Sequence, residues 1–344
     1  MKPDVVVVSN TYAELTSSQS NLGPLIADAL GLENVEALSV ESSGASGAAA
    51  VHVAVSMIGS GQARSVLVVG VEKMRDLEPS KLVGIQGLSA NAEYSQFFGI
   101  SFASLNALLA RIYMNEYGIS RENLSAFPVI AHRNSSTAEH AQFKKKFTKE
   151  EVSRSELIAD PIRVLDCAPV GDGAASLLLV GEELAASEKP LVRVAASESS
   201  SYGSNVFERH HMLHFSSTEA ATKRALKSSG KSISDIDFLE IHDSYSILAA
   251  LEIEAMGLSK PGTSCVDAEG GKFDLNGKFP ISTFGGMKGR GYPVGAAGVY
   301  QFCEAFAQLT DKASSNQVPN SETGLLQTMS GIDESSYVHI LTRS

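Results

Sequence analysis

The sequence contains no tryptophan and only three cysteines, Cys167, Cys265 and Cys303. The cysteines are odd in number, far apart and without metal-site spacing, so they predict neither a disulfide framework nor a cysteine-bound metal. This scarcity is typical of a reducing compartment. No apolar run reaches the roughly 20 residues that a transmembrane helix needs, and the N-terminus lacks the pattern of a signal peptide. We therefore expect a soluble cytoplasmic protein.

Positive charge is also scarce: 28 Lys and Arg residues stand against 39 Asp and Glu, a formal net charge of −11. Because nucleic-acid phosphates are bound by clustered basic side chains, this balance argues against a nucleic-acid-binding protein. A small basic cluster can still hold a nucleotide phosphate, and Lys144 to Lys146 is the candidate run. A solvated basic face is the alternative interpretation.

The 344 residues are enough for two hydrophobic cores or one large pseudo-symmetric core. Short β-branched runs alternate with helical patterns, which is typical of parallel α/β units. The expected strands are residues 4–9, 64–70, 174–180, 237–241 and 337–341, and the expected helices are 48–59, 102–117 and one from Val299.

Two glycine motifs, Gly44-Ala45-Ser46-Gly47 and Gly295-Ala296-Ala297-Gly298, each precede a predicted helix. Such a motif alone is more often a tight turn with close packing. Together with the matching strand order, the pair predicts an internal duplication. We expect one half at residues 1–180, with an inserted loop region at about 75–165, and a second half at 181–344. Residues 181–190 are predicted to be a surface connection.

Residues 40–47 (VESSGASG) resemble the nucleophile segment of thiolases, in particular the archaeal and sterol-carrier-protein-type branch. Further segments match in the family's order to the end of the chain: residues 58–61, 68–74, 131–134, 166–175, 240–243 and 285–295. The resemblance implies an α/β thiolase fold. Its two similar halves would carry mixed five-stranded sheets in αβαβα layers, with an inserted lid. Family members usually carry one more strand–helix unit before residue 4, and its loss would remove one strand from the first sheet.

The resemblance also implies a homodimer that handles acyl-CoA in lipid metabolism, with a CoA thioester as substrate or ligand, no covalently bound cofactor and no metal. Four residues are the predicted CoA contacts: Gly291, Gly295, Ser246 and Lys144. His210, His211 and His214 have a spacing that suggests a metal site, but no carboxylate or cysteine joins them. A surface or interface loop is the better interpretation of these histidines.

The chain departs from the family at three catalytic positions. The nucleophilic cysteine falls on Gly44, the proton-transferring cysteine on Ser244, and the histidine that activates the nucleophile on Tyr292. Glycine has no side chain, so no acyl-enzyme forms there. His242 remains, and in the family this histidine binds the thioester carbonyl oxygen.

Ser43 and Ser46 flank Gly44 and are possible substitute nucleophiles. An unactivated serine needs an adjacent base, however, and the expected histidine is replaced by Tyr292. We therefore do not expect either serine to act as a nucleophile.

Three hypotheses follow. A thiolase relative without the cysteine but with Tyr245 and Tyr292 resembles the superfamily's steroid-degrading aldolases. Those enzymes cleave β-hydroxyacyl-CoA by retro-aldol chemistry and work with a small partner carrying an OB fold and a zinc ribbon. The alternatives are an acetyl-CoA acetyltransferase or 3-ketoacyl-CoA thiolase with an unusual site, and a non-catalytic CoA-binding or scaffolding subunit.

In the aldolase hypothesis, Tyr245 or Tyr292 acts as acid or base. Free tyrosine has a pKa near 10, so a tyrosine base needs a neighbouring cation to lower that pKa. Lys288 and Arg290 are near in sequence. A packed ring with a satisfied hydroxyl is the competing interpretation of each tyrosine.

Overall fold

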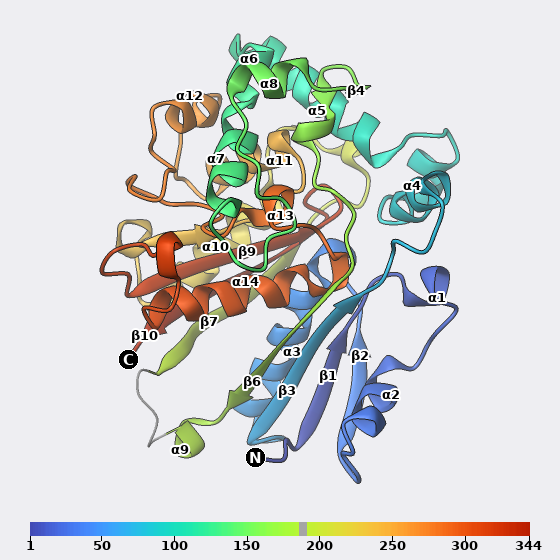
Figure 1. Ribbon diagram of the computed structural model, residues 1–344, viewed down its shortest axis with the longest axis vertical. Coiled ribbons are helices and arrows are strands. Elements are labelled where there is room, and N and C mark those ends of the chain that lie inside the picture. The colour runs from blue at the N-terminus through green and yellow to red at the C-terminus, as the bar shows by residue number, and fades with distance from the viewer. Residues whose placement is uncertain (186–190) are drawn as a thin grey trace.

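The computed structural model describes residues 1–185 and 191–344, so part of the predicted connection at 181–190 lies outside the described residues. Two four-stranded sheets form the frame (Figure 1). The first has the order β2-β1-β3-β6, and its strands are β1 (Val5–Ser9), β2 (Glu36–Val40), β3 (Ser65–Glu72) and β6 (Gly173–Val180). The second has the order β7-β10-β9-β8, and its strands are β7 (Val192–Ser201), β8 (Phe238–Glu240), β9 (Thr323–Ser330) and β10 (Ser335–Arg343).

The two sheets repeat one plan. β1 runs parallel to β3, and β3 pairs with antiparallel β6; likewise β8 runs parallel to β9, and β9 pairs with antiparallel β10. β7 pairs along the second edge of β10, whereas no strand of the described residues pairs along the second edge of β6. We expected five strands in each sheet, but each sheet has four. In the second sheet, the segment next to β8 makes only a single bridge, Leu239 to Ile281.

Two helices, α3 (Ser46–Gly59) and α14 (Val294–Leu309), pack against each other between the sheets (Figure 1). A β-carbon added at Gly47 would lie 2.8 Å from the backbone nitrogen of Val299, and one at Gly298 would lie 2.4 Å from that of Ala48. The two glycine motifs thus face each other, and glycine permits this backbone contact. α14 begins at Val294, five residues before the predicted start at Val299.

Further helices cover the outer faces of both sheets, which gives the predicted αβαβα layering (Figure 1). α2 (Leu22–Ala29) packs on the first sheet, where Ala27 joins Val6 and Val8 in one apolar cluster. α10 (Ser216–Ser229) packs on β7 and β10 of the second sheet. The remaining helices of the two halves are α1 (Ala13–Thr16), α9 (Glu182–Ala185), α11 (Ser246–Ala255), α12 (Ser264–Glu269) and α13 (Gly286–Gly289).

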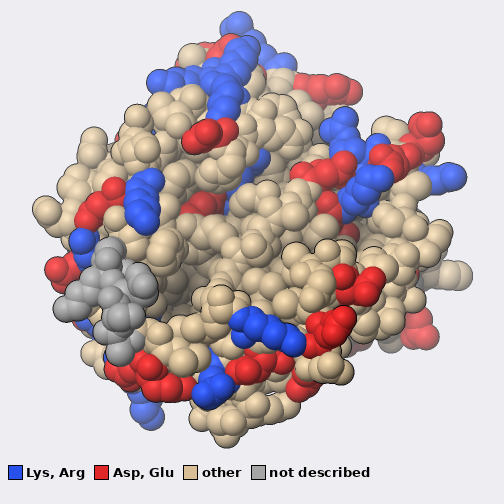
Figure 2. Space-filling view, turned by 60° about the horizontal axis from the view of Figure 1, so that its bottom comes forward, with Lys and Arg blue, Asp and Glu red and all other residues tan. Residues whose placement is uncertain are grey.

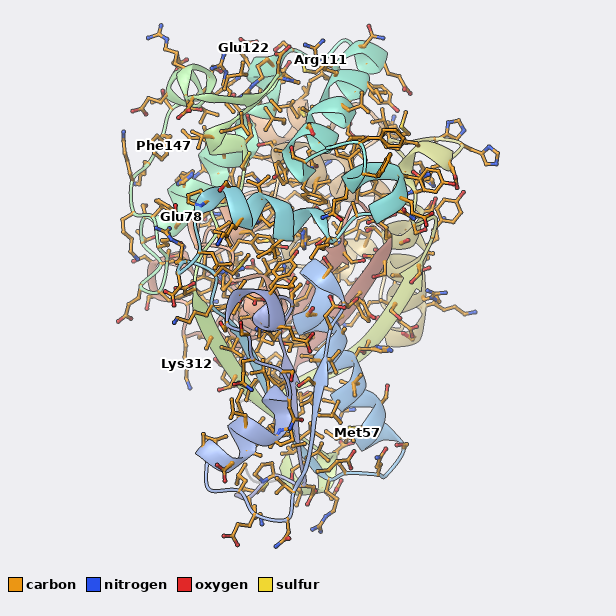
Figure 3. The ribbon with its side chains drawn as sticks, turned by 90° about the vertical axis from the view of Figure 1, so that its right-hand side faces the viewer. Met57, Glu78, Arg111, Glu122, Phe147 and Lys312 are labelled. Atoms are coloured by element: carbon orange, nitrogen blue, oxygen red, sulfur yellow. The ribbon has the colours of Figure 1, made fainter. Side chains whose placement is uncertain are left out.

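The inserted region lies at one end of the molecule, with Arg111 of α5 far from Met57 of α3 (Figure 3). It shares the largest core with the second half, where buried Tyr113 and Phe127 lie in one cluster with Leu248. Its elements are α4 (Pro79–Gly87), a π turn (Ala92–Gln96), α5 (Phe102–Tyr117), α6 (Arg121–Leu124), α7 (Ala126–Ser135), α8 (Lys149–Arg154), β4 (Leu157–Ala159) and β5 (Ile162–Arg163).

The glycine contact between α3 and α14 leads to a stability prediction. Gly47→Ala is expected to lower the free energy of unfolding by about 1–3 kcal/mol, because the added methyl group meets backbone atoms that cannot move aside. Gly59→Ala on the same helix is the control, since a β-carbon there meets nothing within 4 Å. Urea unfolding should leave the control unchanged or slightly more stable. Equal stability of the Gly47 variant and the control would contradict the packing argument.

Candidate active site

Gly44 lies where three other segments converge. It belongs to a 3₁₀ turn (Ser43–Ala45) that joins β2 to α3. A β-carbon added to Gly44 would lie 2.7 Å from Cε1 of His242, 2.7 Å from Oη of Tyr292 and 2.8 Å from the backbone oxygen of Met329. These distances are shorter than real β-carbon contacts, and the Met329 oxygen is backbone. The structure therefore brings three predicted positions together and leaves no room for a side chain at residue 44.

His242 lies two residues after the end of β8, and its tautomer is assigned from its hydrogen-bond partners. Its Nδ1 accepts a long hydrogen bond of 3.5 Å from the Met329 backbone N–H, so the ring proton is assigned to Nε2. Nε2 lies 3.4 Å from the Tyr292 Oη, and the two rings are perpendicular. His242 therefore donates to Tyr292, whose own hydroxyl proton stays available for a substrate.

The electrostatics of His242 keep it neutral. Its side chain is buried, and burial is the main cause that lowers its pKa to about 3; the charges of Lys288 and Arg290 act in the same direction. At neutral pH the ring is thus an uncharged Nε2–H donor. Such a donor suits the oxygen of a thioester carbonyl or of an enolate.

The turn that carries His242 is held by buried polar groups. The backbone N–H of His242 donates to the Glu252 carboxylate at 2.9 Å and to the Gln327 side-chain oxygen at 3.1 Å. The next residue, Asp243, accepts the Met287 N–H at 2.7 Å, and buried Lys288 donates to the Asp243 backbone oxygen. These contacts hold the residues after β8 against α13. The turn that carries Tyr292 begins at Gly291, two residues after α13 ends.

Tyr292 and Tyr245 are both half-buried. Burial is the main cause that raises the pKa of Tyr292 well above its usual value, and Tyr12, Tyr245 and Glu72 add to the rise. The Arg290 charge opposes this rise but is outweighed. Burial, followed by Cys167, also raises the pKa of Tyr245, whose ring packs edge-on to Phe102 with centroids 5.6 Å apart. Both tyrosines are therefore neutral hydroxyl donors. The positive charge of Arg290 does not lower the pKa of Tyr292 enough for the phenol to act as a base.

The serines at the site have no activating base. Ser43 has a left-handed φ of 48°, and its hydroxyl donates to Ser89 at 2.7 Å. The Ser46 hydroxyl donates to the Ser43 backbone oxygen at 2.7 Å. The Ser244 hydroxyl is buried and has no hydrogen-bond partner among the described residues. This supports the expectation that neither Ser43 nor Ser46 serves as a nucleophile.

Three of the four predicted CoA contacts, Ser246, Gly295 and Lys144, make contacts within the protein. The buried Ser246 hydroxyl donates to Asp166 at 2.8 Å, and a β-carbon on Gly295 would lie 2.6 Å from the α-carbon of Asn10. Lys144 is exposed, and its ammonium donates to the backbone oxygens of Ala138 and Glu139.

Gly291 borders a cavity of about 480 Å³ that lies among charged side chains. The residues lining this cavity are Arg75, His140, Gln142, Gly171, Asp172, Arg290, Gly291, Pro293 and Tyr300. None of Gly44, His242 and Ser244 lines it, so Gly291 lies at a cavity separate from the site.

Sequence reasoning missed Glu72, a buried carboxylate that organises the site. It accepts the backbone N–H groups of Thr11 at 3.0 Å, Tyr12 at 3.2 Å and Gly295 at 2.9 Å, and the Asn10 amide at 3.0 Å. Burial raises its pKa, and these donors partly offset the rise. Glu72 thus fixes the turn after β1 against the start of α14, next to Tyr292. It lies in the matched segment 68–74, but nothing in the sequence indicated its partners.

Tyr12 was also missed. It is buried and belongs to the apolar cluster against which Tyr292 packs. Its Oη lies 2.6 Å from the Ser89 Oγ, on the inserted region. A contact across 77 residues leaves no local signal in the sequence.

The described part of the chain was searched for clustered metal ligands and for long apolar helices. His214 pairs with Glu219 at 2.9 Å, and residues 1–185 and 191–344 contain no group of three or more His, Cys, Asp or Glu placed to bind a metal ion. No helix in the same ranges is long and apolar enough to cross a bilayer. On the face shown in Figure 2, acidic and basic side chains are interspersed over most of the surface, and basic side chains gather along its upper edge.

Comparisons with known proteins fit this geometry. Residues 4–183 match the model of the thiolase N-terminal domain, and residues 198–343 match that of the thiolase C-terminal domain-like family. An acetyl-CoA acetyltransferase of Methanothermobacter thermautotrophicus is 35% identical over 99% of this chain and 88% of its own length. Sterol carrier protein 2 of Oryctolagus cuniculus is 30% identical over 86% of this chain and 56% of its own length.

Two solved structures share the fold. One, described as an Ltp2-ChsH2(DUF35) aldolase, has a TM-score of 0.85 at 22% identity and covers 99% of this chain and 87% of its own. The other, human mitochondrial 3-ketoacyl-CoA thiolase, has a TM-score of 0.73 at 15% identity and covers 100% of this chain and 88% of its own. The predicted thiolase fold is thereby confirmed, and the chain belongs to the thiolase family.

Proposed function

We propose that this protein is a carbon–carbon lyase. It would cleave a β-hydroxyacyl-CoA by retro-aldol chemistry or form one by the reverse aldol reaction. One observation carries the proposal: the Tyr292 hydroxyl and His242 occupy the space that a side chain at residue 44 would need. A covalent thiolase mechanism needs a cysteine in that space. A retro-aldol reaction needs no acyl-enzyme, only an oxygen-binding donor and a proton-transfer group.

The residues present can divide these tasks. With substrate bound, the single Nε2–H of His242 turns from the Tyr292 oxygen, 3.4 Å away in this structure, and donates to the thioester oxygen. In cleavage, the β-hydroxyl loses its proton, the Cα–Cβ bond breaks, and its electron pair forms the thioester enolate while the β-carbon leaves as a carbonyl compound. The enolate is then protonated at Cα, so the net reaction neither oxidises nor reduces the substrate.

Tyr292 is the group proposed to transfer the β-oxygen proton. Because its pKa is raised, the phenol is protonated at neutral pH and is suited to protonate the alkoxide in the bond-forming direction. By microscopic reversibility, cleavage runs through the tyrosinate form, which accepts the β-hydroxyl proton and becomes the phenol; because the raised pKa makes this form scarce at neutral pH, the site favours the bond-forming direction. We assign Tyr245 a supporting role, because its charge-free hydroxyl belongs to the surroundings that keep the Tyr292 phenol protonated.

The likeness to an aldolase supports this assignment at the level of the fold. The description of that structure names a complex with a DUF35 protein. For this chain we propose a small partner with an OB fold and a zinc ribbon, together with a homodimer and a cytoplasmic location. The name of the archaeal relative favours a second candidate, an acetyl-CoA acetyltransferase, and a non-catalytic CoA-binding subunit is the third.

An assay of two substrates separates these candidates. The protein, with and without such a partner, should cleave a β-hydroxyacyl-CoA, and it should not thiolyse acetoacetyl-CoA in the presence of CoA. Tyr292→Phe is expected to lower kcat roughly 10²- to 10⁴-fold, because it removes the proton-transfer group but keeps the ring. Tyr202→Phe, at an exposed tyrosine, is the control. Robust thiolysis would support the acetyltransferase, and CoA binding without turnover of either substrate would support the third candidate.

Restoring the family's nucleophile should fail. Gly44→Cys is expected to gain no thiolysis of acetoacetyl-CoA and to lose about 1–3 kcal/mol of stability, because its β-carbon meets the Met329 backbone oxygen. Thermal unfolding and a thiolysis assay measure the two effects. A stable variant that forms an acyl-cysteine would show that the space at residue 44 is free.

The neutral state of His242 predicts a pH profile. The folded-state pKa of about 3 lies below the usual 6.5, so the ring stays uncharged as the pH falls from 8 to 5. The contribution of His242 to kcat/KM should therefore be constant over this range. An acidic limb near pH 6 that is present in the wild type and absent from His242→Asn would contradict this assignment.

A further inference from the structure

The inserted region contains a segment that covers the site. We define residues 79–98 as the cap segment; it comprises α4 and the π turn and follows Glu78 (Figure 3). Its inward side chains, Leu82 and Ile85, belong to the cluster that contains Tyr12 and Val294. Its outer side carries exposed apolar side chains: Val83, Leu88, Tyr94, Phe97 and Phe98.

The cap segment has one polar attachment to the rest of the molecule. Apart from bonds to its chain neighbours, the hydrogen bonds that leave it in the described structure both involve the Ser89 hydroxyl. This hydroxyl lies 2.6 Å from the Tyr12 Oη and accepts the Ser43 hydroxyl at 2.7 Å. No ion pair of the described residues joins the cap segment to another element.

Both partners of Ser89 belong to the turns that form the site. Ser43 directly precedes Gly44 and has a left-handed φ of 48°, a conformation that non-glycine residues keep only when their surroundings enforce it. Tyr12 is fixed by Glu72, which also holds Gly295 at the start of α14. Ser89 therefore connects the cap segment to the turn of Gly44 and to the turn after β1, where Tyr12 belongs to the apolar cluster against which Tyr292 packs.

The inner residues of the site are buried in this arrangement, whereas Tyr292 and Tyr245 are half-buried. Gly44 is buried, and the side chains of His242 and Ser244 are only 2% and 1% exposed. A thioester oxygen cannot reach His242 Nε2 until a covering element moves. The cap segment is suited to move, because it can open by breaking the two hydrogen bonds of one serine and a small apolar contact.

We propose that Ser89 is a positioning residue that latches the cap segment over the acyl site through Tyr12 and Ser43. The role of this latch in turnover rests on the proposed lyase function. The existence of the latch does not depend on that function. Each hydroxyl–hydroxyl bond changes an opening equilibrium by roughly 2- to 10-fold. Closure through Ser89 orders the turns of Gly44 and Tyr292 at the moment when substrate is enclosed.

Hydrogen exchange of the unliganded protein tests the latch. Ser89→Ala is expected to speed amide exchange in peptides from residues 79–98 by roughly 3- to 10-fold, while peptides from β1 and β3 stay unchanged. Ser80→Ala is the matched control, because Ser80 is exposed on the same segment. Ser89→Thr keeps the hydroxyl and should restore wild-type exchange. If Ser89→Ala exchanges like the wild type, or if Ser89→Thr fails to restore exchange, the latch is refuted.

Tyr12→Phe provides a second, independent readout. It keeps the ring and removes only the hydroxyl, so it should also speed exchange of the cap segment. In the double variant Tyr12→Phe/Ser89→Ala, the increase in exchange rate should be smaller than the product of the increases in the two single variants. Both substitutions remove the same hydrogen bond. Fully multiplicative effects would overturn the link between the two residues.

Kinetics with a β-hydroxyacyl-CoA then connect the latch to catalysis. Ser89→Ala should raise KM several-fold with a smaller change in kcat, and Ser89→Thr should reverse the effect; an unchanged KM would overturn the connection. If the wild type turns over no thioester, the lyase proposal fails, and the exchange experiment still decides whether the latch exists.

Discussion

The close approach of three groups to the α-carbon of Gly44 is the constraint on which the site depends. A methyl group there would overlap the Tyr292 hydroxyl, the His242 ring and the Met329 backbone oxygen. The position therefore excludes every residue except glycine while Tyr292 occupies its present place. Glycine at position 44 and tyrosine at position 292 depend on each other, because the phenol oxygen of Tyr292 occupies the volume that a side chain at residue 44 would fill.

This arrangement needs a rigid frame, and buried polar groups at the ends of the central strands provide it. Glu72 at the end of β3 accepts four donors from the turn after β1 and from α14. Glu252 and Gln327 hold the turn after β8. A buried carboxylate without such partners would cost several kcal/mol. The same bonds that make these charges tolerable fix Tyr292 and His242 relative to each other.

Most of the fold was predictable because its strands are short β-branched runs and its motifs occur in one fixed order. The exception is informative. Residues 295–298 were predicted to precede a helix from Val299, since such a glycine motif is typical of a tight turn with close packing. They are the first turn of α14, where contact with the backbone of α3 requires small residues. Tertiary packing therefore decided a position at which local propensity pointed elsewhere.

The site was predictable only in part, for a related reason. Motif positions identified Gly44, His242, Ser244, Tyr245 and Tyr292, since each stands in a matched segment. The proposed CoA contacts Ser246 and Gly295 stand in matched segments too, but one donates to Asp166 and the other packs on Asn10. Tyr12 and Ser89 lie outside any recognisable pattern. Their contact depends on how the inserted region folds back over β1, which the sequence does not encode locally.

The packing also bears on whether the altered site is a decayed thiolase site. Loss of selection at a catalytic cysteine would leave a cavity, and the remaining partners would lack a defined geometry. Here the space is filled by a hydroxyl 3.4 Å from Nε2 of His242, and that histidine keeps the tautomer and the neutral state that carbonyl binding requires. The filled volume at residue 44, the Nε2–H of His242 and the protonated phenol of Tyr292 thus belong to one arrangement, which is compatible with the proposed lyase, and decay alone gives no reason for the three to coincide.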